Sequence, residues 1–152
     1  ELTSKRKIKA SKRIADDLEI CQGDAIYMFK GIRDITNQKS RGLFRAFIVE
    51  AIGRQISIKP TEGQIFEAEK ILHRSLYLEI EKNSRERFTS IRQFVYAVPA
   101  DEKTADAMGV QPGCSLLAAK RIFRNEAGTP LMVTFNYFTG EIAQIVSLIE
   151  RS

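Results

Sequence analysis

A stretch of seventeen residues occurs twice in this chain, ninety positions apart, and this repetition restricts the possible folds more than any other feature. Residues 15–31 read ADDLEICQGDAIYMFKG, and residues 105–121 read ADAMGVQPGCSLLAAKR. An alignment without gaps superimposes Ala15 on Ala105, Asp16 on Asp106, Gly23 on Gly113 and Lys30 on Lys120. The chain is therefore expected to contain one structural unit used twice.

Each copy has the pattern of a helix followed by a β-hairpin. Ile14, Ala15 and Leu18 have helical spacing within residues 10–18. Gly23 and Gly113 then fit turns in which glycine takes a positive φ angle. The strands of the two hairpins are predicted at residues 24–35 and 43–52 in the first copy, and at 114–125 and 131–138 in the second. The connecting loops are residues 36–42 and the compact NEAGTP turn.

The remaining segments add further elements. Residues 91–98 are rich in β-forming residues and predict a strand that leads into the second copy, with SKRKIKA as its counterpart before the first. Residues 74–82 predict a short amphipathic helix, and Thr61 with Gln64 resembles a capping box. The apolar tail at residues 142–151 fits either a strand or a helix, because periodicity does not separate the two.

These elements predict an α+β fold. The strands of both copies are expected to join one antiparallel sheet with helices packed against it. A pseudo-two-fold arrangement would place the two hairpins face to face with a pocket between them, and ligand sites favour such junctions.

Composition and charge exclude several classes of protein. The 152 residues are 43% hydrophobic and 28% charged, which is typical of one globular domain. Six basic residues and one acid within residues 1–13 account for the whole net charge of +5, so the basicity belongs to one end. We interpret this end as a solvated strand or arm; the alternative is a segment close to DNA.

Targeting signals and metal-ligand patterns are not evident. No apolar run has the roughly 20 residues needed to cross a bilayer, so no membrane partner is expected. Without a signal peptide, the chain is expected to be cytoplasmic, with Cys21 and Cys114 unpaired. His73 has no second His or Cys at ligand spacing, so neither a metal nor a cofactor is expected. Because residue 1 is Glu, the chain is interpreted as a fragment.

The order of motifs resembles the UTRA domain, the effector-binding domain of HutC-type GntR transcription regulators. The run AVPADEKTADAMGVQPGCSLLAAKRIFRNEAGTPLMVTFNYF resembles its second half, and RSLYLEIEK resembles its Ser-Leu-Tyr helix. The resemblance covers essentially all of residues 1–152 and implies a chorismate-lyase-like fold. It also implies homodimers, a small-molecule effector, and DNA binding through a winged-helix domain upstream of Glu1.

The resemblance also implies which residues bind the effector. Relatives that sense sugar phosphates hold the anion with an Arg-x-Arg pair on the first hairpin, and the matching residues here are Gly31 and Arg33. Arginine suits that role because its planar fork donates two parallel hydrogen bonds. The lost arginine, with Met132 where the family often has an acid, argues against a typical sugar phosphate. The implied effector-binding residues are Arg33, Glu50, Ser75, Tyr77, Arg121, Thr134, Asn136 and Tyr137.

Four of these residues have an ordinary structural alternative. Arg33 and Arg121 could be solvent-facing strand charges, and Glu50 an outward-facing carboxylate on an apolar strand. Ser75 could bind a ligand at a helix start or simply cap that helix.

Two other functions remain open at this point. A chorismate-lyase-like enzyme would need buried arginines and an acid, which Arg33, Arg121 and Glu50 could supply. Direct nucleic-acid binding would use the basic residues 5–13 and would depend strongly on salt.

Overall fold

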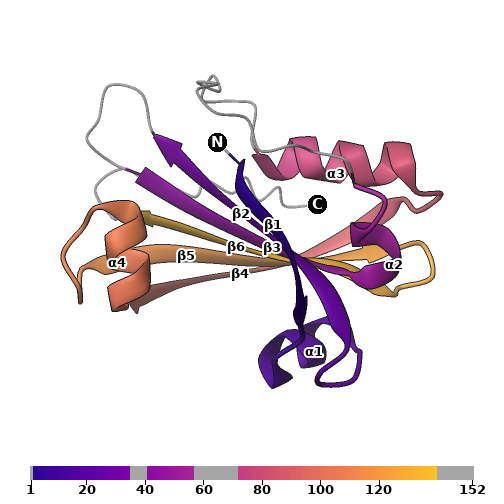
Figure 1. Ribbon diagram of the computed structural model, residues 1–152, viewed down its shortest axis with the longest axis horizontal. Coiled ribbons are helices and arrows are strands. Elements are labelled where there is room, and N and C mark those ends of the chain that lie inside the picture. The colour runs from indigo at the N-terminus through magenta and orange to yellow at the C-terminus, as the bar shows by residue number, and fades with distance from the viewer. Residues whose placement is uncertain (1, 35–40, 57–71, 140–152) are drawn as a thin grey trace, which may run out of the picture.

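The computed structural model describes residues 2–34, 41–56 and 72–139. Within these ranges no helix is long and apolar enough to span a membrane. The elements, shown in Figure 1, are β1 (Leu2–Lys9), α1 (Lys12–Leu18), β2 (Ala25–Asp34), β3 (Arg41–Val49), α2 (Glu50–Gly53), α3 (Leu72–Asn83), β4 (Phe88–Pro99), α4 (Glu102–Met108), β5 (Ser115–Asn125) and β6 (Pro130–Thr139).

The six strands form one antiparallel sheet in the order β1-β2-β3-β6-β5-β4. This confirms the predicted α+β class, with an antiparallel sheet and flanking helices. The prediction that the two hairpins stand face to face around a pocket is wrong. The hairpins meet edge to edge instead, because β3 and β6 pair with each other and backbone hydrogen bonds join the two halves.

The internal repeat is confirmed in local detail. Ser11 and Asp101 cap α1 and α4 with side-chain oxygens, each accepting from the backbone N–H three residues on. Gly23 and Gly113 take φ angles of +92° and +82° in equivalent turns, as predicted. The same offset of ninety residues relates β1 to β4, so each half is a strand, a helix and a hairpin.

The register of the central strands locates the pseudo-two-fold axis. Arg45 and Phe135 are ninety residues apart and are directly paired across β3 and β6. The axis relating the halves therefore passes between these two residues, through the middle of the sheet.

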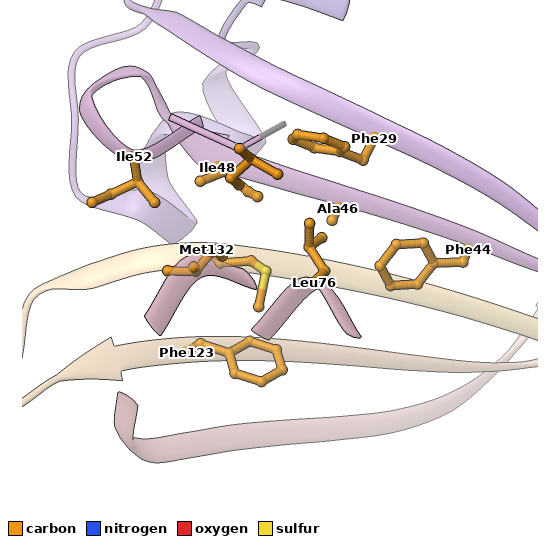
Figure 2. Packing of buried hydrophobic residues seen from close by; sticks show 10 residues of the cluster. Phe29, Phe44, Ala46, Ile48, Ile52, Leu76, Phe123 and Met132 are labelled. Carbon is orange, nitrogen blue, oxygen red and sulfur yellow. The ribbon is translucent and has the colours of Figure 1, made fainter. Parts of the chain in front are cut away.

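The helices divide between the two faces of the sheet. One face, called here the α3 face, packs against α2 and α3. Figure 2 shows Leu76 of α3 among the sheet residues Ala46, Phe123 and Met132. The opposite face, the α1/α4 face, carries two separate clusters, one under each of those helices. In Figure 1, α3 lies at the upper right and α1 at the bottom, with the strands between them.

Each short helix packs on a strand of the other half. Ile14 and Leu18 of α1 share a buried cluster with Val133 and Phe135 of β6. In the same way, α4 packs against β3. The packing of α1 on the other half is reinforced by the largely buried ion pair between Asp17 of α1 and Lys120 of β5, with 2.7 Å between the charged atoms.

One predicted strand is too long. The apolar run at residues 43–52 was expected to be a single strand containing Glu50, but β3 ends at Val49 and Glu50 begins α2. The turn allows Ile52 to enter the core under α3, and Gly53 lies so close to Tyr27 that an added Cβ would meet its ring atoms at 2.6 Å. The predicted capping box at Thr61, the tail at 142–151 and residues 36–40 of the first loop lie outside the described residues.

Candidate functional site

Two buried polar side chains lie at the centre of the α3 face without a hydrogen-bond partner. Strand alternation on β6 turns Thr134 and Asn136 to the same side as Met132, toward the α3 face. Thr134 is 0% and Asn136 7% exposed, yet the Thr134 hydroxyl and the Asn136 side-chain nitrogen make no hydrogen bond. Burying such groups unpaired is costly, so their position indicates a partner that comes from outside the described chain.

Arg121 lies next to this pair. It is directly opposite Thr134 across β5 and β6, so both side chains emerge on the α3 face. Burial lowers the pKa of its guanidinium from the usual value, although arginine remains charged. Its Nε donates to Gln93 Oε1 at 2.6 Å, and the described residues offer it no carboxylate. A half-buried cation without a counter-charge is suited to receive an anion.

The backbone of Arg33 lies far from that of Arg121 in the sheet. Arg33 on β2 is paired with Gly42 on β3, and Gly42 lies next to Phe138 on β6. Phe138 is in turn paired with Leu117 on β5, which is four residues from Arg121. Three strand spacings separate the two backbones by about 14 Å across the sheet, and four residues add about 13 Å along it. The two strand positions are therefore too far apart to be adjacent in one small site.

Glu50 lies outside this group as well. As the first residue of α2, it extends over the edge strand and binds Lys7, with 2.5 Å between Lys7 Nζ and Glu50 Oε1. Its hydrogen bond is the main reason why the pKa of Lys7 is raised. Glu50 is thus paired with Lys7 of the edge strand β1, whereas Arg121 lies on β5, four strands away in the order of the sheet. The structure therefore does not place Glu50 beside Arg121, as a lyase-like site would need.

Ser75 and Tyr77 both lie on α3. Ser75 is inside the helix and not at its N-cap position, which removes the simple capping alternative. The Tyr77 ring stacks on Phe88 with 5.3 Å between the ring centroids, so it fastens α3 to β4. Burial is the main cause that raises the pKa of the Tyr77 hydroxyl, and the neighbouring carboxylate of Glu81 raises it further.

Tyr137 lies on the other face of the sheet. Since it follows Asn136 on β6, alternation turns it toward α1 and α4, where it packs in both clusters. The guanidinium of Arg45 lies 5.8 Å from its ring centroid. Burial is the main cause that raises the pKa of the Tyr137 hydroxyl, and the nearby Tyr96 raises it further. Tyr137 therefore cannot contact a ligand that binds Thr134 and Asn136.

Among the expected residues whose side chains the structure describes, it brings together Arg121, Thr134 and Asn136. It also adds Gln93, which sequence reasoning missed because nothing in the local pattern singles out a glutamine on an apolar strand. The equivalence of β4 with β1 could have indicated that Gln93 lies on an edge strand, but it could not have indicated the hydrogen bond that Gln93 accepts from Arg121. The group offers one cation and two uncharged polar groups, a combination suited to binding rather than to proton transfer.

Comparison with known proteins gives the family and the fold of the chain. The UTRA domain model matches residues 1–144. No curated protein matches the chain.

Among solved structures, a GntR-family transcriptional regulator from Enterococcus faecalis has a TM-score of 0.77 at 18% identity, covering 98% of this chain and 99% of that one. The ligand-binding domain of a GntR-family regulator from Bordetella bronchiseptica has a TM-score of 0.77 at 18% identity, covering 99% and 87%. PhnF of Mycobacterium smegmatis has a TM-score of 0.75 at 14% identity, covering 100% of this chain but 62% of that one. At these identities the likeness shows the fold.

Proposed function

The chain belongs to the UTRA domain family, and on that premise we propose that it is the effector-sensing and dimerising domain of a GntR-family, HutC-type transcription regulator. In this proposal it carries no chemistry of its own. DNA binding belongs to a winged-helix domain upstream of residue 1, and PhnF, of which this chain spans 62%, leaves room for such a domain. A regulator of this kind would act in the cytoplasm.

One observation carries the proposal of a ligand site. Thr134 and Asn136 bury polar groups that find no partner among the described residues, and the half-buried Arg121 stands beside them. A natural core seldom keeps two such groups unless something binds them. We therefore place the effector on the α3 face, over the centre of the sheet.

The chemistry of this group suggests the class of effector. Arg121 would bind an anionic group, and the Asn136 amide would donate to a neutral carbonyl or hydroxyl oxygen. Thr134 can donate or accept. With Gly31 in place of a second arginine and Arg33 far away, one singly charged group fits better than a phosphate held by two arginines.

Regulation follows from differential affinity. In a dimer, two copies of this domain would set the spacing of the two DNA-binding domains, which must match the half-sites of an operator. An effector changes that spacing only if it binds one arrangement more tightly than the other.

The test is a thermal-shift screen of this chain against small carboxylates, amides, sugars and phosphates, followed by calorimetry of the hits. We expect at least one singly charged metabolite to raise Tm. The Arg121→Met variant should lose the response, whereas Arg54→Met, which removes an exposed arginine directly after α2, should keep it. Indifference to every class, or equal responses in both variants, would refute the proposed site. Incubation with chorismate should yield no 4-hydroxybenzoate.

A further inference from the structure

The edge strand β4 exposes apolar side chains on both faces of the sheet. Ile91 and Val95 lie on the α3 face and are 53% and 44% exposed, whereas Phe94 lies on the other face and is 41% exposed. The strand runs for 12 residues and pairs only with β5 among the described strands. A long, apolar and unpaired edge is a template for pairing with another strand.

The other edge strand of the sheet, β1, has a sequence that opposes pairing with a further strand. By the offset of ninety residues, β1 is the twin of the second half of β4. Where β4 has Phe94, Val95, Tyr96 and Ala97, β1 has Ser4, Lys5, Arg6 and Lys7. Lysines on an edge strand oppose pairing with a second strand. The two edge strands occupy equivalent positions in the two halves, and only β4 lacks these lysines.

The sequence of β4 is complementary to itself. If β4 meets its own copy antiparallel with Gln93 on the two-fold axis, Ile91 lies opposite the partner's Val95 on the α3 face. On the other face, Arg92 lies opposite the partner's Phe94, a cation–aromatic pair. No like charges oppose each other in this register. Pairing with β1 of a second copy would instead set its lysines against the apolar edge.

We propose that β4 pairs antiparallel with β4 of a second copy of this chain, with Gln93 at the two-fold axis. The inference rests on the proposed dimeric function and names the surface that performs it. The pairing would join two six-stranded sheets into one continuous sheet, in an isologous contact of the kind that closes a dimer.

This surface is connected to the candidate effector site. Gln93 Oε1 accepts from Arg121 Nε at 2.6 Å, which leaves the Gln93 amide nitrogen free to donate to the partner's Gln93. An anion that draws Arg121 toward Thr134 would weaken its hold on Gln93 at the axis. Effector binding and the geometry of the dimer are thereby linked through one side chain.

The first test is analytical ultracentrifugation of this chain and two variants. Val95→Lys gives β4 the residue found at the twin position of β1. Leu78→Lys changes an equally exposed apolar residue on α3 and serves as the matched control. We expect a dimer for the wild type and for Leu78→Lys, and a dimer dissociation constant at least about tenfold higher for Val95→Lys. Circular dichroism would verify that each variant is folded.

The second test is disulfide trapping in a background without Cys21 and Cys114. Residues directly opposite in antiparallel strands have Cα atoms about 4.5–5.5 Å apart, within the range of a disulfide. The Q93C variant should form a covalent dimer on mild oxidation, whereas K9C on the exposed twin edge should not.

The outcomes separate the surface from the function. A wild-type dimer that Val95→Lys leaves intact and that Q93C does not trap would overturn the β4 assignment alone. A monomeric wild-type chain would overturn dimerisation by this domain, while the effector screen would still decide ligand binding.

Discussion

The Thr134→Val substitution should stabilise the protein while impairing its response to effector. Thr134 is fully buried, and its hydroxyl makes no hydrogen bond in the described chain. Valine has nearly the same shape, so the substitution removes an unsatisfied polar group and leaves the packing of the α3 face almost unchanged. Stabilising changes that damage function are typical of sites kept for binding.

The expected size follows from the cost of burying a hydroxyl without a partner. That cost is about 1–3 kcal/mol in protein substitutions. We therefore expect the free energy of unfolding to rise by about 1–2 kcal/mol, and Tm by about 2–4 °C for each kcal/mol in a domain of this size.

Scanning calorimetry and urea unfolding would measure the effect, with Thr104→Val as the matched control. Thr104 is also buried, but its hydroxyl accepts from Arg45 Nη2 at 3.5 Å, so its replacement should destabilise by about 0.5–1.5 kcal/mol. If Thr134→Val lowers stability as the control does, the Thr134 hydroxyl is satisfied within the protein and the reasoning for the site fails.

Two further predictions concern the frame that carries the site. The Thr104 bonds lower the pKa of Asp101, so its stabilising cap is present above the ordinary carboxyl pKa and is lost as pH falls through the lowered value. Asp101→Ala should therefore cost about 1 kcal/mol near pH 7 and progressively less as pH falls through the lowered pKa of Asp101. Ser11→Ala at the equivalent cap should cost a similar amount at every pH, as urea titrations would show. Gly53→Ala should destabilise by about 1–3 kcal/mol, because its Cβ would meet Tyr27 at 2.6 Å; a urea midpoint equal to that of the exposed control Ala51→Ser would disprove this clash.

Local signals in the sequence predicted most of the elements correctly. The turn glycines and the β-rich runs are recognised from a few neighbouring residues, and the repeat tests each prediction a second time. The end of β3 was missed because residues 43–52 are continuously apolar, and such a run does not distinguish a strand from a strand followed by a helical turn. Only the packing of Ile52 under α3 decides that the chain turns at Glu50.

The candidate site was less predictable because it depends on register across the sheet. Arg33 and Arg121 belong to equivalent strands, yet their spacing depends on how β3 pairs with β6, which no local pattern specifies. Tyr137 is a different kind of miss. Strand alternation alone separates it from Thr134 and Asn136, so its place on the opposite face could have been read from the sequence.

The packing of α1 and α4 has a consequence for the origin of the chain. Each helix covers a strand of the other half, so a single half would leave Ile14 and Leu18 without the apolar cover that Val133 and Phe135 provide. Such a half could bury its apolar helix only on a second copy of itself. The simplest ancestor is therefore a symmetric pair of short chains, later fused end to end. Fusion allowed the two edges and the two arginine positions to diverge, which a symmetric ancestor could not do.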